Sequence, residues 1–185
     1  YAPDAVARPD YLSAPGLGEK VIGVASFDNI ASTSAVLSVD GQDIAYNSMS
    51  FSGPIPTAGS NDVVYVGLAC NANPLMANPA GKIALAARGN CSFGEKATNA
   101  INAGASAVVI HNNAPGNFNG TLGAPIGDGS VPVVSVSQAD GLYMQGQPAP
   151  VLTWTDRTMS VMLPTGGLIS SFSSYGLSPD LALKP

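Results

Sequence analysis

One segment, residues 81–113, constrains the fold of this 185-residue chain more than any other. It holds two short apolar runs, Lys82–Ala87 and Ala107–Ile110, separated by a stretch with a different pattern. Apolar runs of this length that are bounded by glycine and polar residues are typical of buried strands. We therefore expect two buried strands in this segment.

The stretch between the two runs predicts a helix. Ser92-Phe-Gly-Glu95 has the pattern of a capping box, in which the Ser92 hydroxyl accepts from the Glu95 amide and the Glu95 carboxylate accepts from the Ser92 amide. Apolar residues follow at helical spacing, and Gly104 stands where a helix takes a left-handed residue at its end. Strand, helix and strand together form a parallel crossover unit, which is right-handed in ~98% of cases.

The composition narrows both the fold class and the partners. Charged residues make up 10% of the chain, against about 25% in an average domain, and there are 21 Gly and 15 Pro. Many turns and few long helices are expected from such a chain. The net charge of −5 argues against nucleic acid and against an anionic membrane surface, and no apolar run approaches the ~20 residues of a membrane span. We expect neither nucleic acid nor membrane as a partner.

The rest of the chain adds strands and one more helix. Asp40-Gly41 is a strong hairpin signal between two strands. A long loop rich in Asn, Gly and Pro covers residues 112–128, and loops of this length in compact domains are often functional. The further elements expected are strands at Ala35–Val39, Asp43–Tyr46, Asp62–Leu68 and Val131–Val136, a helix at Gln138–Gln145, and a closing hairpin of Pro150–Thr155 and Met159–Met162 around Asp156-Arg157.

The chain offers little for catalysis. It has one histidine, His111, which could act as a general base, but no G-x-S-x-G elbow or paired nucleophile accompanies it. We interpret His111 as a strand-end residue that bonds to loop backbone. The acidic residues are scattered without the spacing of a metal loop, so no metal and no cofactor are predicted. Arg88, between a buried strand and a capped helix, either pairs with Glu95 or lines a groove.

Several blocks of the sequence, in order, resemble one family. Arg88-Gly-Asn-Cys-Ser-Phe93, Lys96-Ala97, Ala103-Gly-Ala105 and the run from Ala107 to Asn113 resemble the signature of the protease-associated (PA) domain. Val131-Pro-Val-Val-Ser-Val-Ser137 with Asp140-Gly141 is similar to a later part of the same signature. The resemblance covers roughly residues 60–155. It implies an α+β, β-rich fold, a barrel or sandwich of mixed strands with the crossover helix and one further short helix packed on it.

The two flanks resemble a different family, the subtilisin-like serine proteases. Val21–Asn29 resembles a strand of the subtilase catalytic core, and Ile169–Gly176 with Leu181–Pro185 resembles the next piece of that core. The resemblance implies a PA domain inserted into a secreted subtilase. We therefore expect three parts: a flank at 1–29, a PA domain at 30–168 and a second flank at 169–185.

The family resemblance implies a non-catalytic module that controls access or recognition of protein substrates near the active-site cleft of the parent protease. Its partners would be those protein or peptide substrates and the parent catalytic domain. The alternatives are an insert that only stabilises the parent and, less in keeping with the residues, a small hydrolase that uses His111. The candidate binding surface, where adjacent strands end, comprises Arg88, Asn90, Ser92, His111, Asn112, Asn113 and Phe118.

The two cysteines, Cys70 and Cys91, lack the further ligands of a zinc site. In the secreted setting that the resemblance implies, they would form a disulfide. Closing the loop between them would stabilise the fold by about 3 kcal/mol in the chain-entropy model. Two reduced, buried thiols are the alternative.

Overall fold

The computed structural model describes residues 26–163, 165–170, 173, 176–177 and 183–184. Thr33–Met159 form one compact unit, and the remaining described residues belong to a second. Most of the two flanks that resemble a subtilase lie outside the described residues, and the boundaries expected at 29/30 and 168/169 stay a prediction. None of the helices in the described part of the chain has the length and apolar character needed to cross a membrane.

Seven strands form a closed barrel in the order β1-β2-β6-β5-β4-β3-β7. The neighbouring pairs β3–β4, β4–β5 and β5–β6 are parallel, whereas β1–β2, β2–β6 and β3–β7 are antiparallel. The predicted β-rich α+β fold with mixed strands is therefore confirmed. The strands are β1 Ala31–Val39, β2 Gln42–Ser48, β3 Ser60–Gly67, β4 Ile83–Ala87, β5 Ala107–His111, β6 Val133–Val136 and β7 Val151–Met162.

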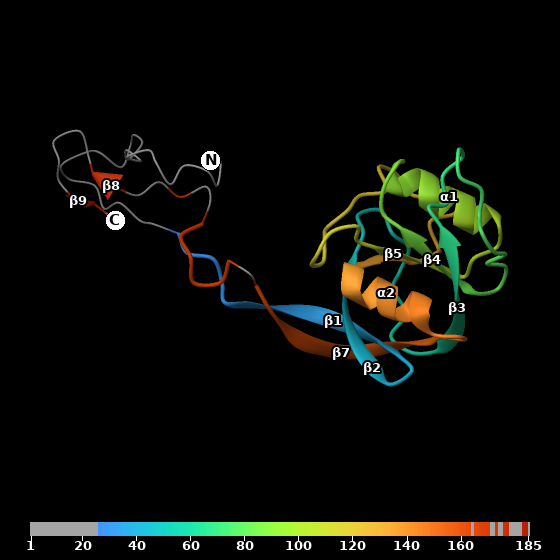
Figure 1. Ribbon diagram of the computed structural model, residues 1–185, viewed down its shortest axis with the longest axis horizontal. Coiled ribbons are helices and arrows are strands. Elements are labelled where there is room, and N and C mark those ends of the chain that lie inside the picture. The colour runs from blue at the N-terminus through green and yellow to red at the C-terminus, as the bar shows by residue number, and fades with distance from the viewer. Residues whose placement is uncertain (1–25, 164, 171–172, 174–175, 178–182, 185) are drawn as a thin grey trace. The chain divides into compact units, whose positions relative to one another are not determined.

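Two helices pack against the barrel, on different sides of it (Figure 1). They are α1, Phe93–Asn102, and α2, Gln138–Gly146. In the second unit, Phe27 forms a bridge with Ile169, and the short strands β8, Gly176–Leu177, and β9, Leu183–Lys184, pair with each other.

The predicted turn and crossover both form. Asp40 and Gly41 have φ values of 49° and 86°, the two positive values that a type I′ hairpin turn requires. The chain then leaves β4, forms α1 and returns as β5, which pairs parallel with β4. Ser92 caps α1 by accepting from the Glu95 amide at 3.1 Å, and Gly104 follows its end with φ 87°. The sequence therefore locates both structures correctly.

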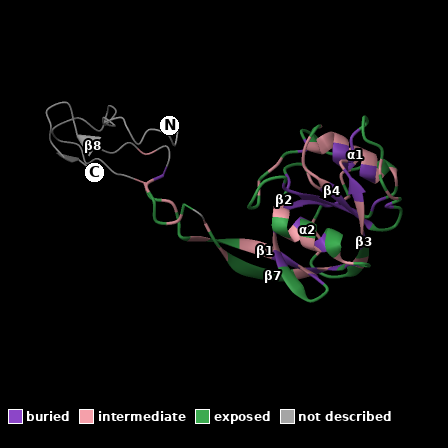
Figure 2. Ribbon diagram, viewed as in Figure 1, coloured by how far each residue is buried: buried purple, intermediate pink, exposed green. Residues whose placement is uncertain are grey.

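The parallel strands are buried on both faces (Figure 2). Alternate residues of β4 point to different clusters: Ile83 and Leu85 join the cluster that includes Met144 of α2, whereas Ala84 and Ala86 join the cluster that includes Ala97 of α1. A strand with apolar neighbours on both sides needs an unbroken apolar run, which explains the two runs seen in the sequence. The small alanines on the second face leave room for α1 to lie close to the sheet.

The closing hairpin expected around Asp156-Arg157 is wrong. Val151–Met162 is one continuous strand of 12 residues. A two-residue hairpin needs positive φ at its centre, which glycine and asparagine supply readily, and neither residue of this pair has it. Both are exposed, and Arg157 forms a bidentate ion pair with Asp43, with nitrogen–oxygen distances of 2.6 and 2.7 Å. The polar pair is therefore the solvent-facing part of a strand.

Candidate functional site

Two loops meet at one end of the parallel strands. Because β4 and β5 are adjacent and parallel, with Ala87 opposite His111, their carboxyl ends release residues 88–92 and 112–128 side by side. The Arg88 amide donates to the His111 carbonyl at 2.9 Å and extends the pairing by one residue. This is the arrangement that the sequence predicted for the candidate surface.

Arg88 is the centre of this surface. Its Nη1 donates to Asn112 Oδ1 at 2.9 Å. Its guanidinium carbon lies 4.7 Å from the centre of the Phe118 ring and 5.7 Å from that of Phe93, and the two rings stack with their centres 5.2 Å apart. All three side chains of this Arg88 cluster, Arg88, Phe93 and Phe118, are partly exposed. A cation over two aromatic faces is held in a fixed orientation that solvent can still reach.

The long loop is tied to the barrel at Phe118. The Phe118 carbonyl accepts from the hydroxyl of Ser135 at 2.6 Å and from the Asn47 carboxamide at 3.2 Å. Ser135 is fully buried in β6, so this anchor is part of the core.

Two predicted surface residues lie beneath the surface instead. His111 and Asn112 are 6% and 4% exposed. Asn112 accepts from Arg88 and from the Asn113 amide, and it donates to the Gly116 carbonyl at 2.9 Å. Asn112 is therefore a positioning residue that holds Arg88 and the start of the loop.

His111 is packed against α2. A Cβ on Gly141 would lie 2.1 Å from His111 Cβ, so the helix can approach this closely only with glycine there. Nδ1 donates to the Asn112 carbonyl at 2.9 Å, as expected for a strand-end histidine, and Nε2 has no partner among the described residues. Burial holds the pKa of His111 below its usual range. The ring is therefore a packed residue of the core rather than part of the exposed surface.

Asn90, Ser92 and Asn113 are exposed, as the surface prediction requires. Asn90 has φ 64°, a left-handed value that asparagine tolerates better than most residues. The Ser92 hydroxyl is occupied as the helix cap. Only half of the predicted capping box forms, because Glu95 Oε1 accepts from the Asn71 amide at 2.7 Å rather than from Ser92.

The predicted Arg88–Glu95 pair is also wrong. Arg88 forms no ion pair with any described residue. The Glu95 carboxylate instead accepts a hydrogen bond from the Asn71 amide. The other interpretation of Arg88, as a residue that lines a surface, is the one the contacts support.

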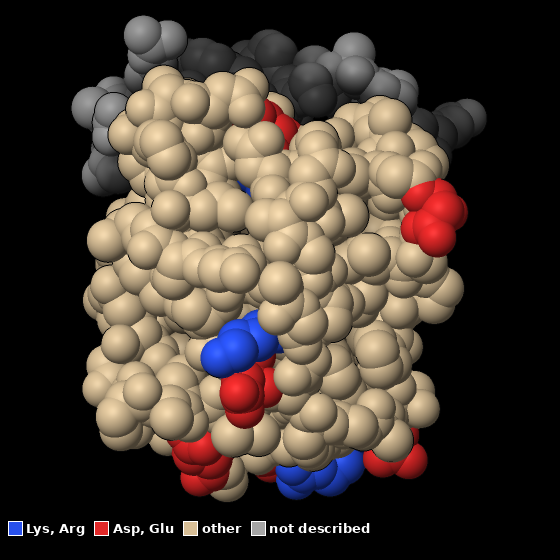
Figure 3. Space-filling model, turned by 90° about the vertical axis from the view of Figure 1, so that its right-hand side faces the viewer, with Lys and Arg blue, Asp and Glu red and all other residues tan. Residues whose placement is uncertain are grey.

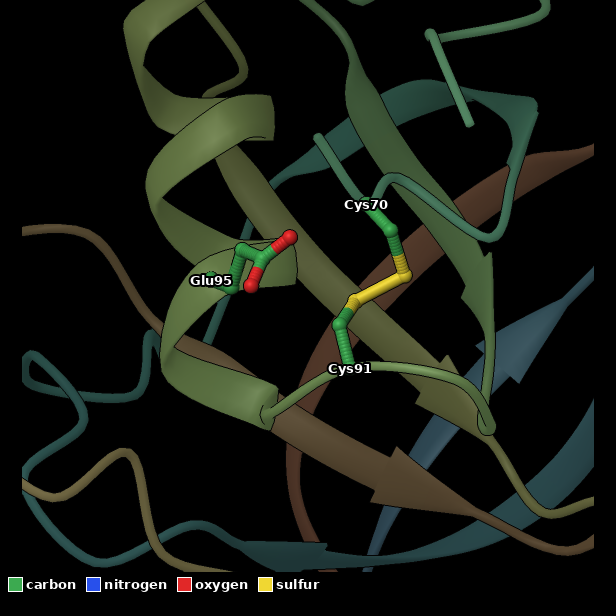
Figure 4. A group of neighbouring side chains, drawn as sticks. All are labelled: Cys70, Cys91 and Glu95. Atoms are coloured by element: carbon green, nitrogen blue, oxygen red, sulfur yellow. A yellow bond between two sulfur atoms is a disulfide. The ribbon is translucent and has the colours of Figure 1, made fainter. Parts of the chain in front are cut away.

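A disulfide joins Cys70 to Cys91, with 5.9 Å between the Cα atoms (Figure 4). The alternative of two reduced thiols does not hold. Cys70, Cys91 and Glu95 have ligand atoms within 4.8 Å of one another, but sulfurs in a disulfide carry no thiolate charge. Lys96 Nζ also lies 3.4 Å from Cys70 Sγ. The cluster therefore braces the Arg88–Ser92 loop and offers no cation site.

Two residues of interest were missed in the sequence. Lys96 is fully buried, donates to the Leu68 carbonyl at 2.6 Å, and has its pKa lowered by that burial. Phe51 is 53% exposed with φ 68°, an unusual value for an aromatic residue. Ser50, the residue before it, bonds to Gly120 and Leu122 of the long loop. The signal for Phe51 was the Ser-Gly-Pro that follows it, which marks a turn but not an exposed ring.

Comparison with known proteins identifies the class of this barrel. Residues 59–144 match the model of the PA domain family. The chain therefore contains a PA domain, as its signature blocks implied. The residues of the candidate surface lie within this match.

The most similar relatives are peptidases. The chain is 41% identical over 107 residues to leucine aminopeptidase 2 of Trichophyton rubrum, a match that covers 58% of this chain and 21% of the relative. It is 29% identical over 183 residues to the C5a peptidase of Streptococcus pyogenes serotype M18, covering 96% of this chain and 16% of the relative. The zinc aminopeptidase BSAP of Bacillus subtilis superposes with a TM-score of 0.56 at 30% identity, covering 72% of this chain and 34% of that one. The chain thus spans about a fifth of the length of the fungal relative it matches.

Proposed function

We propose that this chain is a non-catalytic PA module of a secreted peptidase and that the Arg88 cluster contacts the protein substrates or protein partners of that enzyme. The observation that carries the proposal is the cluster itself. Arg88 and Phe118 are partly exposed, yet buried Asn112 and Ser135 hold them in place. A fixed arginine beside aromatic rings is the composition typical of interaction hot spots.

The parent enzyme in this proposal is a subtilisin-like serine endopeptidase. Support comes from the flanks, which resemble subtilase core segments. The match to the C5a peptidase also includes the flanks, since it covers 96% of this chain, whereas the match to the Trichophyton aminopeptidase covers 58%. The disulfide favours an oxidising compartment and so a secreted protein.

An aminopeptidase parent is the second candidate, because the Trichophyton aminopeptidase is 41% identical over 107 residues and the Bacillus aminopeptidase superposes at 30% identity. The two parents differ in their chemistry. A serine enzyme is inactivated by a sulfonyl fluoride and is indifferent to a zinc chelator, whereas a zinc aminopeptidase shows the opposite pattern. Treating the full-length parent with each reagent separates the candidates.

The role of the module is tested in the parent enzyme. We would compare the parent with a form that lacks residues 33–159, on a folded protein substrate and on a short peptide. We expect deletion to reduce cleavage of the protein and to leave cleavage of the peptide unchanged. If both activities fall together with thermal stability, the module is a scaffold, and the proposal fails.

Point variants refine that test. Arg88→Gln removes the guanidinium and its bond to Asn112, and Phe118→Ala removes a ring that packs against a core cluster, so the thermal stability of each variant is measured beside its activity. Arg157→Gln is the control, at an exposed position of strand β7. The first two should alter protein cleavage and the third should not. Equal effects from all three would count against a specific surface.

A further inference from the structure

The charges of the described residues single out Arg88. Lys82 pairs with Asp62 at 3.6 Å and Arg157 pairs with Asp43. Lys96 is buried and bonded to a backbone carbonyl. Of the Lys and Arg side chains that the structure describes, Arg88 is therefore the solvent-accessible one without a carboxylate partner.

The low proportion of charged residues in this protein makes an exposed arginine without a carboxylate partner among the described residues more notable. Figure 3 shows a face on which most side chains are uncharged and the charged ones are scattered. The net charge is −5, so acidic groups outnumber basic ones along the chain. An arginine in a protein of this composition has many possible acidic partners, and Arg88 is placed where none of the described ones reaches it.

The carboxylates nearest in sequence to the two loops are engaged elsewhere. Glu95 accepts from the Asn71 amide, and Asp128 accepts from the amide and hydroxyl of Ser130 at 2.9 and 2.6 Å. Those bonds hold the pKa of Asp128 below its usual range, so it stays ionised and in its turn. Neither is free to neutralise Arg88.

The guanidinium has donors left over. An arginine carries five N–H donors in a planar fork, and the described residues accept one bond, from Nη1 to Asn112. The guanidinium carbon lies over the Phe118 and Phe93 rings, and the side chain stays partly exposed. A planar fork held in this way suits a carboxylate, which can accept two parallel bonds. The N-terminus of α1, which begins at Phe93, adds a favourable dipole for an anion.

We propose that Arg88 is the receptor for a carboxylate of a bound peptide, either the side chain of an Asp or Glu or a free C-terminus. The proposal rests on the proposed function, because it assigns the ligand chemistry of the same surface. Phe118 and Phe93 lie against the guanidinium, Asn112 accepts its Nη1 bond, and exposed Asn113 follows Asn112 in the same loop. The ligand supplies the carboxylate that none of the described residues brings to Arg88.

The test uses the 185-residue chain, labelled with ¹⁵N, and three pentapeptides whose N-termini are blocked. The first has a central Asp and an amidated end, the second has a central Asn and a free C-terminal carboxylate, and the third has a central Asn and an amidated end. Titrations are followed through the Arg88 side-chain signal and the amides of residues 112–118. We expect the carboxylate peptides to bind about tenfold or more tightly than the neutral one, and added salt to weaken them.

Variants of Arg88 separate its charge from its shape. Arg88→Gln removes the charge and should abolish the preference for carboxylate peptides. Arg88→Lys keeps the charge but loses the fork, so it should retain part of the preference. Arg157→Gln is the matched control and should behave as the parent chain.

Asn112→Asp is a second route that leaves Arg88 intact. An aspartate at 112 keeps the acceptor oxygen that faces Nη1 and supplies a carboxylate within the chain. It should therefore suppress binding of both carboxylate peptides as strongly as Arg88→Gln does. The amide spectrum of each variant reports whether it is folded.

The outcomes are distinct for the two proposals. Equal binding of the neutral peptide at the same residues would overturn the carboxylate assignment and leave the contact surface standing. Unchanged binding in folded Arg88→Gln and Asn112→Asp would overturn it as well. Carboxylate binding at Arg88 combined with normal protein cleavage by a parent without the module would uphold the site and refute the proposed function. A response to one carboxylate peptide alone identifies the source of the ligand.

Discussion

A glycine in α2 provides a sharp test of how the site is supported. Gly141 lies against His111, and a Cβ added there would be 2.1 Å from His111 Cβ and 2.3 Å from its Cγ. Carbon atoms in contact are normally about 3.5–4.0 Å apart. In Gly141→Ala, the helix and β5 must therefore separate by more than about 1 Å. The Cβ atoms of residues 141 and 111 are both attached directly to the backbone, so a change of rotamer cannot move them apart.

The expected cost follows from two opposing effects. Alanine is favoured over glycine within a helix by about 1 kcal/mol. Overpacking a close contact costs typically ~1–3 kcal/mol, and the rigid atoms involved place this site at the upper end. We expect Gly141→Ala to lower the free energy of unfolding by about 2 kcal/mol.

Urea unfolding measures this difference. With a slope of about 2 kcal/mol per molar urea, the midpoint should fall by about 1 M. Gly146→Ala is the matched control, since Gly146 is in the same helix, has no positive φ and would place its Cβ in open space. The control should be as stable as the parent or slightly more so. Equal midpoints for the two variants would refute the close contact between α2 and His111.

Three further predictions concern the residues around the site. His111 is the single histidine, and because burial lowers its pKa in the fold, the unfolded chain takes up a proton near pH 6.5 whereas the folded chain takes it up only at lower pH. Stability should therefore fall as the pH drops below about 6.5, and His111→Gln should flatten this part of the pH profile. Loss of the disulfide in Cys70→Ser/Cys91→Ser should cost about 3 kcal/mol in urea unfolding. Ser135→Ala leaves the Phe118 carbonyl with a weaker anchor, so it should cost ~1–3 kcal/mol and speed hydrogen exchange in residues 112–120.

For each of the three variants, one result would contradict the prediction. An unchanged slope between pH 7 and 5 in the histidine variant would show that the ring titrates as in the unfolded chain. A disulfide variant as stable as the parent would mean that the loop is held by other contacts, such as that of Lys96 with Leu68. Normal exchange in the serine variant would assign the loop's order to Asn47 instead.

The sequence located the barrel strands and both helices because those signals are local. The runs in β4 and β5, the cap at Ser92 and the turn at Asp40-Gly41 each fix a backbone conformation within a few residues. The failure at Asp156-Arg157 has a non-local cause. Whether a polar pair turns or continues depends on residues of neighbouring strands, and here Asp43 of β2 forms an ion pair with Arg157 at 2.6 Å.

The site could be predicted only in part for the same reason. Adjacent parallel strands place Arg88 near residues 112–118, and this followed from topology alone. The stacking of Phe93 on Phe118 depends on the path of the long loop, and the burial of His111 depends on how α2 approaches. Neither is encoded within a short stretch of sequence. The capping box suggested a use for Glu95 that Asn71, 24 positions away, takes over.

The residues that hold the two loops of the candidate site differ from those that are exposed on its surface. The residues that hold the two loops are buried or bonded: the disulfide and Glu95 brace one loop, and Asn112 and Ser135 brace the other. The residues that would meet a ligand, such as Asn90, Asn113 and the outer edge of Arg88, contribute little to that bracing. Exposed substitutions away from packed or strained positions usually change stability by less than about 0.5 kcal/mol. Under the proposed function, ligand preference can therefore vary at Asn90 and Asn113 while the barrel keeps its structure, whereas a change at Arg88 also removes its bond to Asn112.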